Sequence, residues 1–386
     1  MAERIYLDNA STTFPKPPSV AKAVYSYMTE AGTNIGRGDY SSAYGVEDAV
    51  FETRELLCGL LGGEDPSQVV FTRNVTESIN LLLKGFLEPG DHVVVTSMEH
   101  NAVMRPLMQL TARGITFSRA ACSPEGELDP REIERLITPR TKLVLTTHAS
   151  NVCGTVTPIR EIAEICRARR IRYAIDAAQT AGVLPIDASA WGIDAVCYTG
   201  HKGLLGPQGI GGILFTGDFS NEISALVAGG TGSSSDLETM PEFMPDRLEA
   251  GTPNLPGIIG LGAGIEWINK KGIDVIREHE LKLTDRLIKG IATLEKAGLV
   301  SMAGKESIEG RTGVVSIQTP RHELAQVAHA LDSDFGIQVR VGLHCAPSAH
   351  KTLGTFPTGT IRFSVGWANT KRDVDRAIEA LDALLS

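Results

Sequence analysis

Residues 172–203 read RYAIDAAQTAGVLPIDASAWGIDAVCYTGHKG, and this stretch decides the fold. It holds two short β-rich runs, at 172–176 and 194–198, and polar or glycine-rich residues follow each run directly. Short apolar runs that alternate with helical patterns are typical of a parallel sheet with helices on both faces. Ligands bind beside the carboxyl ends of the strands in such a sheet, so we expect Asp176 and Lys202 to share a site.

The same alternation extends toward the N-terminus. Strands are also predicted at 68–72, 92–96 and 142–147, with helices at 77–85, 101–113, 130–136 and 159–169. This pattern predicts an α/β fold with a mostly parallel sheet. We assign this large domain to residues 16–255.

A smaller domain is predicted beyond a glycine- and proline-rich hinge at 251–257. Its expected elements are a helix at 258–271, strands at 311–317 and 360–365, and an amphipathic helix at 371–385. These patterns predict an α+β domain over residues 256–386. Residues 1–15 are expected to pack with this smaller domain.

Composition excludes several classes of protein. The 386 residues are 42% hydrophobic and 22% charged, which is ordinary for a globular domain and excludes a disordered or fibrous chain. A net charge of −9 argues against nucleic-acid or anionic-membrane partners. No apolar run approaches the roughly 18 residues that a membrane span needs, and no signal peptide is visible. The six cysteines include no C-x-x-C pair, which favours a reduced, cytoplasmic location.

Polar side chains follow the predicted strands where each strand ends. Thr76 lies near a helix start, where backbone N–H groups bind anions, although it could simply cap that helix. His100 could stack on a planar ligand or move protons, but a lone histidine in a loop is more often a surface residue. Asn151 offers both a donor and an acceptor.

Asp176 and Lys202 are the most informative of these residues. Asp176 ends an apolar strand, so it should be buried and should need a cationic partner, such as the protonated ring nitrogen of a ligand. The alternative is that Asp176 caps the next helix. Lys202 lies in a loop bounded by Gly200 and Gly203, where desolvation would lower its pKa and make it a nucleophile.

One cofactor, pyridoxal 5′-phosphate, would use all of these groups. Its parts are a phosphate, a carbonyl carbon, a ring nitrogen and a phenolic oxygen. Their expected partners are, in turn, Thr76 with Thr199 and His201, then Lys202, Asp176 and Gln179.

The order of these motifs resembles the class V aminotransferase family of fold type I pyridoxal-phosphate enzymes. The matching segments are YLDNASTT at 6–13, Thr76-Glu77, Glu99-His100, Ser150-Asn151, DAAQ at 176–179, Gly200-His201-Lys202 and RLEAGTPN at 247–254. The resemblance covers nearly the whole chain. It implies a seven-stranded type of sheet in the large domain and a homodimer.

Residues 340–346, RVGLHCA, resemble the active-cysteine motif of cysteine desulfurases of the second group, which includes selenocysteine lyase-like enzymes. That group commonly has two histidines before the cysteine, and Leu343 replaces the first of them here. The resemblance implies conversion of L-cysteine to L-alanine, with a persulfide on Cys345 for transfer to an acceptor protein or thiol. A selenocysteine lyase, or a class V transaminase or β-lyase with an incidental Cys345, stays open as an alternative.

The resemblance also implies roles at the cofactor. Lys202 would bind the cofactor covalently, His100 would stack on its ring, and Asp176 and Gln179 would contact its nitrogen and phenolic oxygen. The phosphate would be held by the backbone of Val75, by Thr76, Thr199 and His201, and by Thr252 of the neighbouring subunit.

The substrate carboxylate would be held by Arg362 with help from Asn151, because an arginine fork pairs with a carboxylate through two hydrogen bonds. The role of Arg37 stays open between the substrate and a surface ion pair.

Cys345 has neighbours that could act on it. His344 and Arg340 could favour its thiolate form, which is the reactive one. His344, Cys345 and His350 could also be taken for part of a metal site, but structural zinc sites usually show paired ligands, so no metal is expected.

Overall fold

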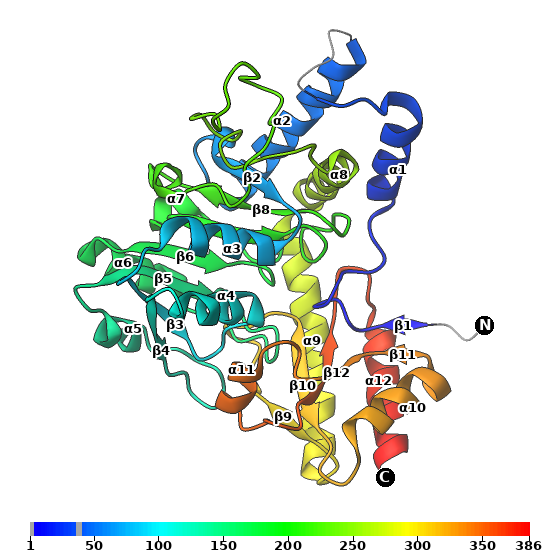
Figure 1. Cartoon of the computed structure of the whole chain (residues 1–386). Coiled ribbons are helices and arrows are strands. Elements are labelled where there is room, and N and C mark those ends of the chain that lie inside the picture. The colour runs from blue at the N-terminus through cyan, green and yellow to red at the C-terminus, as the bar shows by residue number, and fades with distance from the viewer. Residues whose placement is uncertain (1–3, 36–40) are drawn as a thin grey trace.

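The computed structural model describes residues 4–35 and 41–386 (Figure 1). Arg37, whose role the sequence leaves open, lies outside the described residues. None of the described helices combines the length and the apolar character that a membrane span needs.

A seven-stranded sheet forms the centre of the larger part of the molecule, as the α/β prediction requires. Its strand order is β2-β8-β7-β6-β5-β3-β4, and all neighbours pair in parallel except β8, which runs antiparallel to β2 and β7. The strands are β2 (Val69–Thr72), β3 (His92–Thr96), β4 (Thr116–Ala120), β5 (Thr141–Thr147), β6 (Arg172–Asp176), β7 (Ala195–Thr199) and β8 (Gly211–Phe215).

Helices bury both faces of this sheet (Figure 1). Successive residues of a strand face opposite sides, so Ile175 packs with one cluster of apolar side chains while Ala174 packs with the other. One face is covered by α3 (Val75–Phe86) and α4 (Asn101–Thr111). The opposite face is covered by α2 (Ser41–Leu61), α5 (Pro130–Leu136), α6 (Ile159–Arg169) and α8 (Leu255–Lys271). Burial on both faces explains why the central strands are continuous apolar runs.

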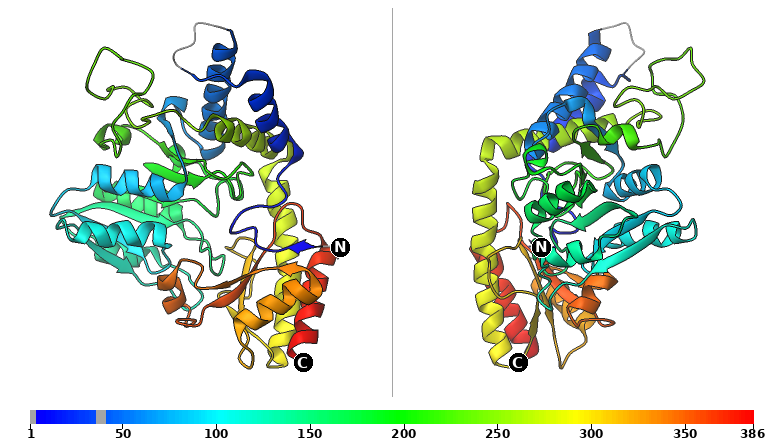
Figure 2. Two further views of the ribbon diagram at one scale, coloured as in Figure 1. Left: turned by 45° about the vertical axis from the view of Figure 1, so that its right-hand side comes forward. Right: turned by 90° about the vertical axis from the view of Figure 1, so that its left-hand side faces the viewer.

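A second sheet lies in the C-terminal part of the chain. It is antiparallel, with the order β12-β13-β10-β9. Its strands are β9 (Ser301–Ala303), β10 (Val314–Gln318), β12 (Arg340–Gly342) and β13 (Thr360–Ser364). The helices of this part are α9 (Ile273–Lys296), α10 (Leu324–Phe335), α11 (Pro347–Thr352) and α12 (Lys371–Leu385). Figure 2 shows α9 running along one side of the molecule beside α12.

The N-terminal segment connects the two parts. β1 (Ile5–Tyr6) pairs in parallel with β11 (Ile337–Gln338), and Ser364 N donates to Leu7 O at 2.7 Å. A few residues later, Thr13 donates through its backbone N to His201 O (3.1 Å) and through Oγ1 to Lys202 O (2.9 Å). The segment therefore ties the second sheet to the lysine loop. The division of the chain at residues 15 and 255 stays a prediction.

The structure contains elements that the sequence patterns did not predict. β8 begins with Gly211 and Gly212, and glycine disfavours strands, so no strand is predicted there. A Cβ at Gly212 would lie 2.2 Å from the Tyr198 hydroxyl. β4 is an edge strand with several partly exposed residues, so it lacks an apolar run. α9 follows α8 after the single residue Gly272. The sequence patterns did not predict α9 as a separate helix within the α+β domain.

A largely buried ion pair fastens α2 to the segment that precedes α8. Arg54 contacts both carboxylate oxygens of Glu249 at 2.8 and 2.7 Å, and Glu249 Oε1 also accepts from Phe71 N at 2.6 Å. Their side chains are 8% and 16% exposed. Removing one partner of such a pair leaves an uncompensated charge.

We therefore expect Glu249→Ala to destabilise the protein by about 3 kcal/mol, because Arg54 would stay buried without its partner. The melting temperature measured by circular dichroism checks this. Glu278→Ala removes an exposed ion pair with Lys282 and should change the melting temperature little. Equal effects of the two substitutions would contradict the prediction.

Candidate active site

The loops after β3, β6 and β7 bring His100, Asp176 and Lys202 into one neighbourhood. Lys202 contributes to lowering the pKa of His100 and opposes the rise in the pKa of Asp176. β3, β5, β6 and β7 run parallel, so their carboxyl ends lie at one edge of the sheet.

The loop that carries Lys202 is tightly closed. Gly206 N donates to Gly200 O at 2.8 Å, and Leu205 N donates to Lys202 O at 2.9 Å. Gly203 passes so close to Ala181 that a Cβ would lie 2.5 Å from the Ala181 carbonyl oxygen. The pKa of Lys202 is lowered to about 8, chiefly by burial; Asp176 opposes this shift, and the charges of Arg362 and Arg340 add to it. Lys202 is therefore partly neutral near neutral pH and able to act as a nucleophile.

Asp176 is 4% exposed at the end of β6. Its Oδ1 accepts from Ala178 N at 2.9 Å, and burial raises the pKa of its carboxyl group. The alternative that Asp176 caps the next helix is wrong, because α7 (Ala188–Trp191) begins later and is capped by Asp187. The remaining oxygen of Asp176 has no protein donor among the described residues, which suits a ligand cation.

His100 is the N-cap of α4 and is not a freely exposed side chain. Its Nδ1 accepts from Ala102 N at 3.0 Å, so the proton of the neutral ring lies on Nε2. Burial, followed by the charges of Lys202 and of nearby arginines, lowers its pKa to about 4. The ring is therefore neutral and fixed in orientation.

Glu99 is a buried residue whose role sequence reasoning did not find, although the motif that contains it was noted. Its side chain accepts from Thr96 Oγ1 at 2.6 Å and from Thr147 N at 3.0 Å. Burial raises its pKa to about 8. Glu99 links the ends of β3 and β5 directly before His100. The sequence signal that could have predicted this role is the position of a carboxylate between an apolar strand and a histidine, where burial requires hydrogen-bond donors.

The anion region lies at the start of α3 and beside β7. Asn74 caps α3 by accepting from Glu77 N at 3.0 Å, so the alternative that Thr76 is only a cap is wrong. Thr76 is exposed in the first turn. Thr199 Oγ1 and His201 Nδ1 are buried, and neither has a hydrogen-bond partner within the described chain. Buried polar atoms nearly always have partners, so these two atoms mark a place for a ligand.

Gln179 and Thr252 lie in two different hollows. Gln179 lines a small cavity together with Lys202, and its Nε2 donates to Ala10 O at 3.0 Å. Thr252 is exposed in a hollow of about 370 Å³ that Arg73 and Glu77 also line. Val75, the first residue of α3, is buried.

Arg362 is 1% exposed on β13 and lies beside Asn151. Its NH1 donates to Asn151 O at 3.0 Å, and its NH2 forms an ion pair with Asp8 at 2.7 Å. Asn151 also donates through Nδ2 to His344 O at 2.8 Å. The residues expected to hold a carboxylate thus adjoin the cysteine loop.

The loop that carries Cys345 is fixed at the rim of the site. Asn101 N, at the start of α4, donates to Cys345 O at 2.8 Å. His344 and Cys345 have positive φ values of 48° and 58°, a strained backbone that the surrounding contacts maintain. The Cys345 side chain is exposed. The thiol therefore lies in the loop next to His100 and open to solvent.

His344 does not supply a positive charge to Cys345. Its ring is buried, its Nε2 lies 3.0 Å from Thr360 Oγ1, and burial lowers its pKa to about 2. The hypothesis that a charged His344 favours the thiolate is therefore wrong. Within the described residues, no group of three or more histidine, cysteine or acidic side chains is placed to hold a metal ion.

Comparisons with known proteins agree on one family. The Aminotransferase class-V family model matches residues 5–377. A probable cysteine desulfurase from Methanothermobacter thermautotrophicus is 35% identical over 389 residues, covering 100% of this chain and 95% of that protein. The apo structure of a cysteine desulfurase from Thermococcus onnurineus superposes with a TM-score of 0.92 at 32% identity, covering 99% of this chain and 94% of that one. The Escherichia coli cysteine desulfurase CsdA, in an S-sulfonic acid form, has a TM-score of 0.88 at 28% identity, with coverage of 99% and 96%.

The low pKa of Lys202 predicts a distinct pH profile for its reaction with aldehydes. In cofactor-free protein, reductive labelling with formaldehyde should rise through a midpoint near pH 8, because only the neutral amine reacts. Ordinary lysines have a pKa of about 10.4, so exposed lysines should continue to gain label well above pH 8. Peptide mass mapping measures both profiles. A Lys202 profile like that of the exposed lysines would refute its desolvation.

Proposed function

The chain belongs to the class V aminotransferase family, and from this premise we propose that it is a pyridoxal 5′-phosphate-dependent cysteine desulfurase. It converts L-cysteine to L-alanine and keeps the sulfur as a persulfide on Cys345. The observation that carries this proposal is the bond between Asn101 N and Cys345 O, which holds an exposed thiol beside the site of His100 and Lys202.

The residues present fit the cofactor. Thr199 Oγ1 and His201 Nδ1 are buried and have no hydrogen-bond partner in the described part of the chain. Together with the first-turn N–H groups of Val75 and Thr76, they suit a phosphate. Gln179 lies in the same cavity as Lys202 and suits the phenolic oxygen. When bound, pyridoxal phosphate withdraws electrons from the α-carbon of an amino acid.

The chain's own residues prepare the substrate. Lys202 would hold the cofactor covalently, and its Nζ would take the α-proton of the substrate, a task for which a pKa of about 8 is suited. Asp176, which is buried, would favour the protonated form of the cofactor's ring nitrogen. His100 contributes a neutral ring of fixed orientation for stacking.

Cys345 is the sulfur acceptor within the protein. Its thiolate attacks the sulfur of L-cysteine, so that a new S–S bond forms while the C–S bond of the substrate breaks. The net change converts L-cysteine and the Cys345 thiol into L-alanine and the Cys345 persulfide, and no outside oxidant is needed. Arg362 and Asn151 orient the substrate carboxylate during this step.

The alternatives are less well supported. The curated relatives and similar structures are named cysteine desulfurases, which favours L-cysteine over a transaminase or β-lyase reaction. A preference for selenocysteine would change the substrate but none of the residues above. Leu343, in place of the usual first histidine, lies next to His344 in the loop and is the residue to test for this preference.

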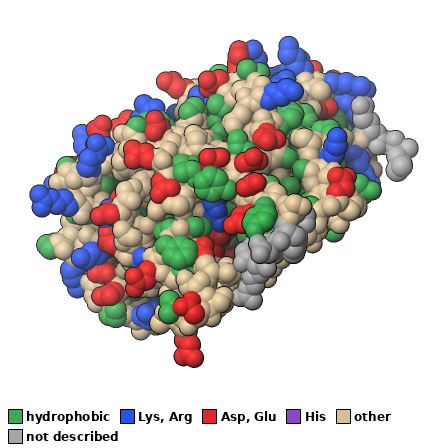
Figure 3. All heavy atoms as spheres, turned by 90° about the horizontal axis from the view of Figure 1, so that it is seen from above, with side chains coloured by type: hydrophobic (Ala, Val, Ile, Leu, Met, Phe, Trp, Pro, Cys, Tyr) green, Lys and Arg blue, Asp and Glu red, His purple; other side chains and the backbone are tan. Residues whose placement is uncertain are grey.

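We also propose that two copies of the chain associate. Exposed apolar side chains lie on α1 (Pro18–Ser26), on the π-helical turn η1 (Tyr27–Ala31) and on α2; they are Tyr25, Met28, Tyr44 and Phe51. The view from above shows hydrophobic side chains among charged ones on this face (Figure 3). Thr252 of one copy would then reach the phosphate of the other. The acceptor of the sulfur is a protein or thiol, and the cytoplasmic location stays a prediction.

We expect Cys345→Ser to lower alanine release from L-cysteine by at least about 100-fold, because the attacking thiolate is lost; this is about 2.7 kcal/mol on the barrier. Mass spectrometry after incubation with L-cysteine should find an added sulfur on Cys345 of the unaltered chain. Cys122→Ser is the matched control and should retain activity, since burial raises the pKa of Cys122 to about 11. Undiminished release from the Cys345 variant would exclude the proposed nucleophile.

We expect Asp176→Asn to retain the cofactor but to lower kcat by about 100-fold, because an amide provides no negative charge for the ring nitrogen. Visible absorbance measures cofactor content, and alanine release measures kcat. Asp218→Asn replaces an exposed acid paired with Arg172 and should leave both unchanged. A normal kcat in the Asp176 variant would argue against this role.

A further inference from the structure

Arg362 holds more partners than a free substrate clamp should. Its NH2 donates both to Asp8 Oδ1 (2.7 Å) and to Ser11 Oγ (2.8 Å), which uses both protons of that nitrogen. Its NH1 donates to Asn151 O at 3.0 Å. The edge formed by Nε and NH2 is the one that grips a carboxylate from the side, and Asp8 and Ser11 occupy the NH2 half of it.

The other half of that edge is the Nε–H group of Arg362. Arg362 Nε is buried and has no hydrogen-bond partner among the residues that the structure describes. Burial lowers the pKa of Arg362, whereas the charge of Asp8 opposes this shift. Asp8 is therefore the resident counter-ion of a buried guanidinium group, and the unpaired Nε is a donor that awaits an acceptor.

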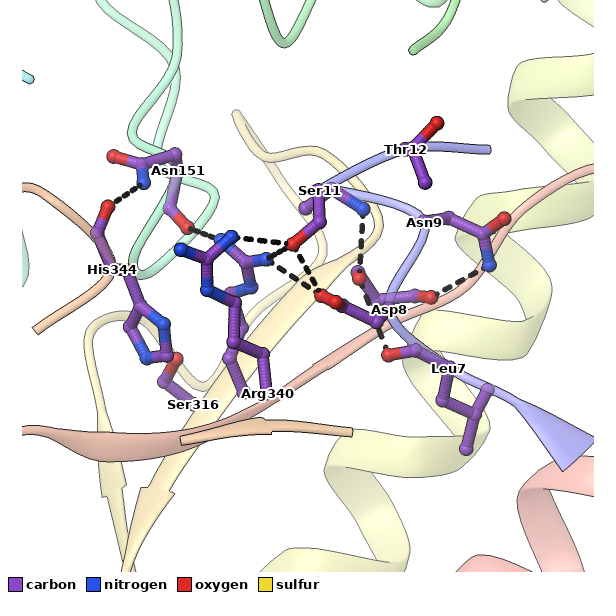
Figure 4. A network of polar contacts seen from close by, with 12 residues as sticks. Leu7, Asp8, Asn9, Ser11, Thr12, Asn151, Ser316, Arg340 and His344 are labelled. Carbon is purple, nitrogen blue, oxygen red and sulfur yellow. Dashed lines mark hydrogen bonds and ion pairs between the residues drawn. The ribbon is translucent and has the colours of Figure 1, made fainter. Parts of the chain in front are cut away.

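Arg340 is a second guanidinium group at the same place. It pairs in register with Arg362 across β12 and β13, and its NH1 donates to Ser11 Oγ at 2.7 Å. Figure 4 shows Asp8, Ser11 and Arg340 lying together, next to Asn151 and the cysteine loop at His344. Arg340 is only partly buried, and its NH2 and Nε make no hydrogen bond with the described part of the chain.

Both guanidinium groups act on the reaction site. Each contributes to lowering the pKa of Lys202 and of His100. An anion between them would therefore lie beside the amine and the imidazole that the proposed reaction uses. Asp8, by contrast, is 20% exposed, so its carboxylate has solvent into which it can turn.

We infer that the substrate carboxylate is bound by Arg340 and Arg362 together, and that it enters by replacing Asp8 on Arg362. Ser11 is a positioning residue, since its hydroxyl oxygen accepts from both arginines and its proton goes to Asp8 Oδ1 at 2.8 Å. In this exchange an ion pair with Asp8 is replaced by one with the ligand, so the buried charge of Arg362 is compensated before and after binding. Asp8 thereby weakens carboxylate binding and eases release of the product.

The inference rests on the proposed function for the identity of the ligand, but its test does not require turnover. The holoenzyme is titrated with L-alanine, the proposed product, and its dissociation constant is obtained from the rise in melting temperature. Ethylamine, which has the same amine and methyl group without the carboxylate, is titrated in parallel. The difference between these two probes isolates the contribution of the carboxylate.

We expect Asp8→Asn to lower the dissociation constant of L-alanine by about tenfold, because the competing carboxylate is gone. Arg340→Gln should raise this constant by about tenfold, and binding of ethylamine should stay the same in both variants. Asp8→Ser removes the same charge with a smaller side chain and provides the measurement if Asp8→Asn does not fold. Glu278→Gln, at an exposed ion pair on α9, is the control that should change neither dissociation constant.

Weaker or unchanged alanine binding in both Asp8 variants would overturn the exchange and would leave Asp8 as a support for Arg362. Unchanged binding in Arg340→Gln would overturn the two-arginine site. The assay also separates this inference from the proposed function. Failure of the unaltered enzyme to release alanine from L-cysteine would refute the proposed function. The dissociation constants of L-alanine and ethylamine would still decide the role of Asp8.

Discussion

Burial of a lysine amine beside a buried aspartate is the constraint on which the rest of the site depends. A lysine in solvent would stay protonated at neutral pH and would not attack a carbonyl group. Desolvation removes that obstacle at Lys202, and Asp176 limits the shift so that the amine still carries a proton part of the time. The charges of Arg362 and Arg340 lower the pKa of Lys202 as well. The reactivity of Lys202 therefore follows from its burial and from the balance of the charges around it.

The cysteine loop shows how a reactive group is kept both accessible and fixed. Left-handed backbone at two successive residues other than glycine costs free energy, so the loop needs contacts to hold it. Those contacts come from the start of α4 at Asn101 and from the amide of Asn151. Both contacts hold carbonyl oxygens of the loop, and neither of them involves the thiol. The orientation of the loop is thus set in part by the helix that His100 caps.

Much of this fold was predictable from the sequence, because the central strands are apolar runs that end in polar residues. The strands β3 and β6 and the helices α5, α6 and α12 match their predicted ranges. β8 was missed because Gly212 accommodates the Tyr198 ring, a requirement that no local pattern reveals. The roles of Asp8 and Ser11 were missed for a different reason. Their partner Arg362 lies 354 and 351 residues away, and neither local composition nor spacing reports such a contact.

The attachment of the N-terminal segment has a consequence for how the chain is made. β1 pairs with β11, and Ser364 N donates to Leu7 O, so residues 5–7 find these partners only after residues 337–364 have been synthesised. Contacts of such long sequence separation form slowly, because a large loop must close first. The central sheet can be complete by residue 215, well before that closure. Arg362 can meet Asp8 only after that sheet has had time to form, so the carboxylate pocket assembles on a large domain that is already folded.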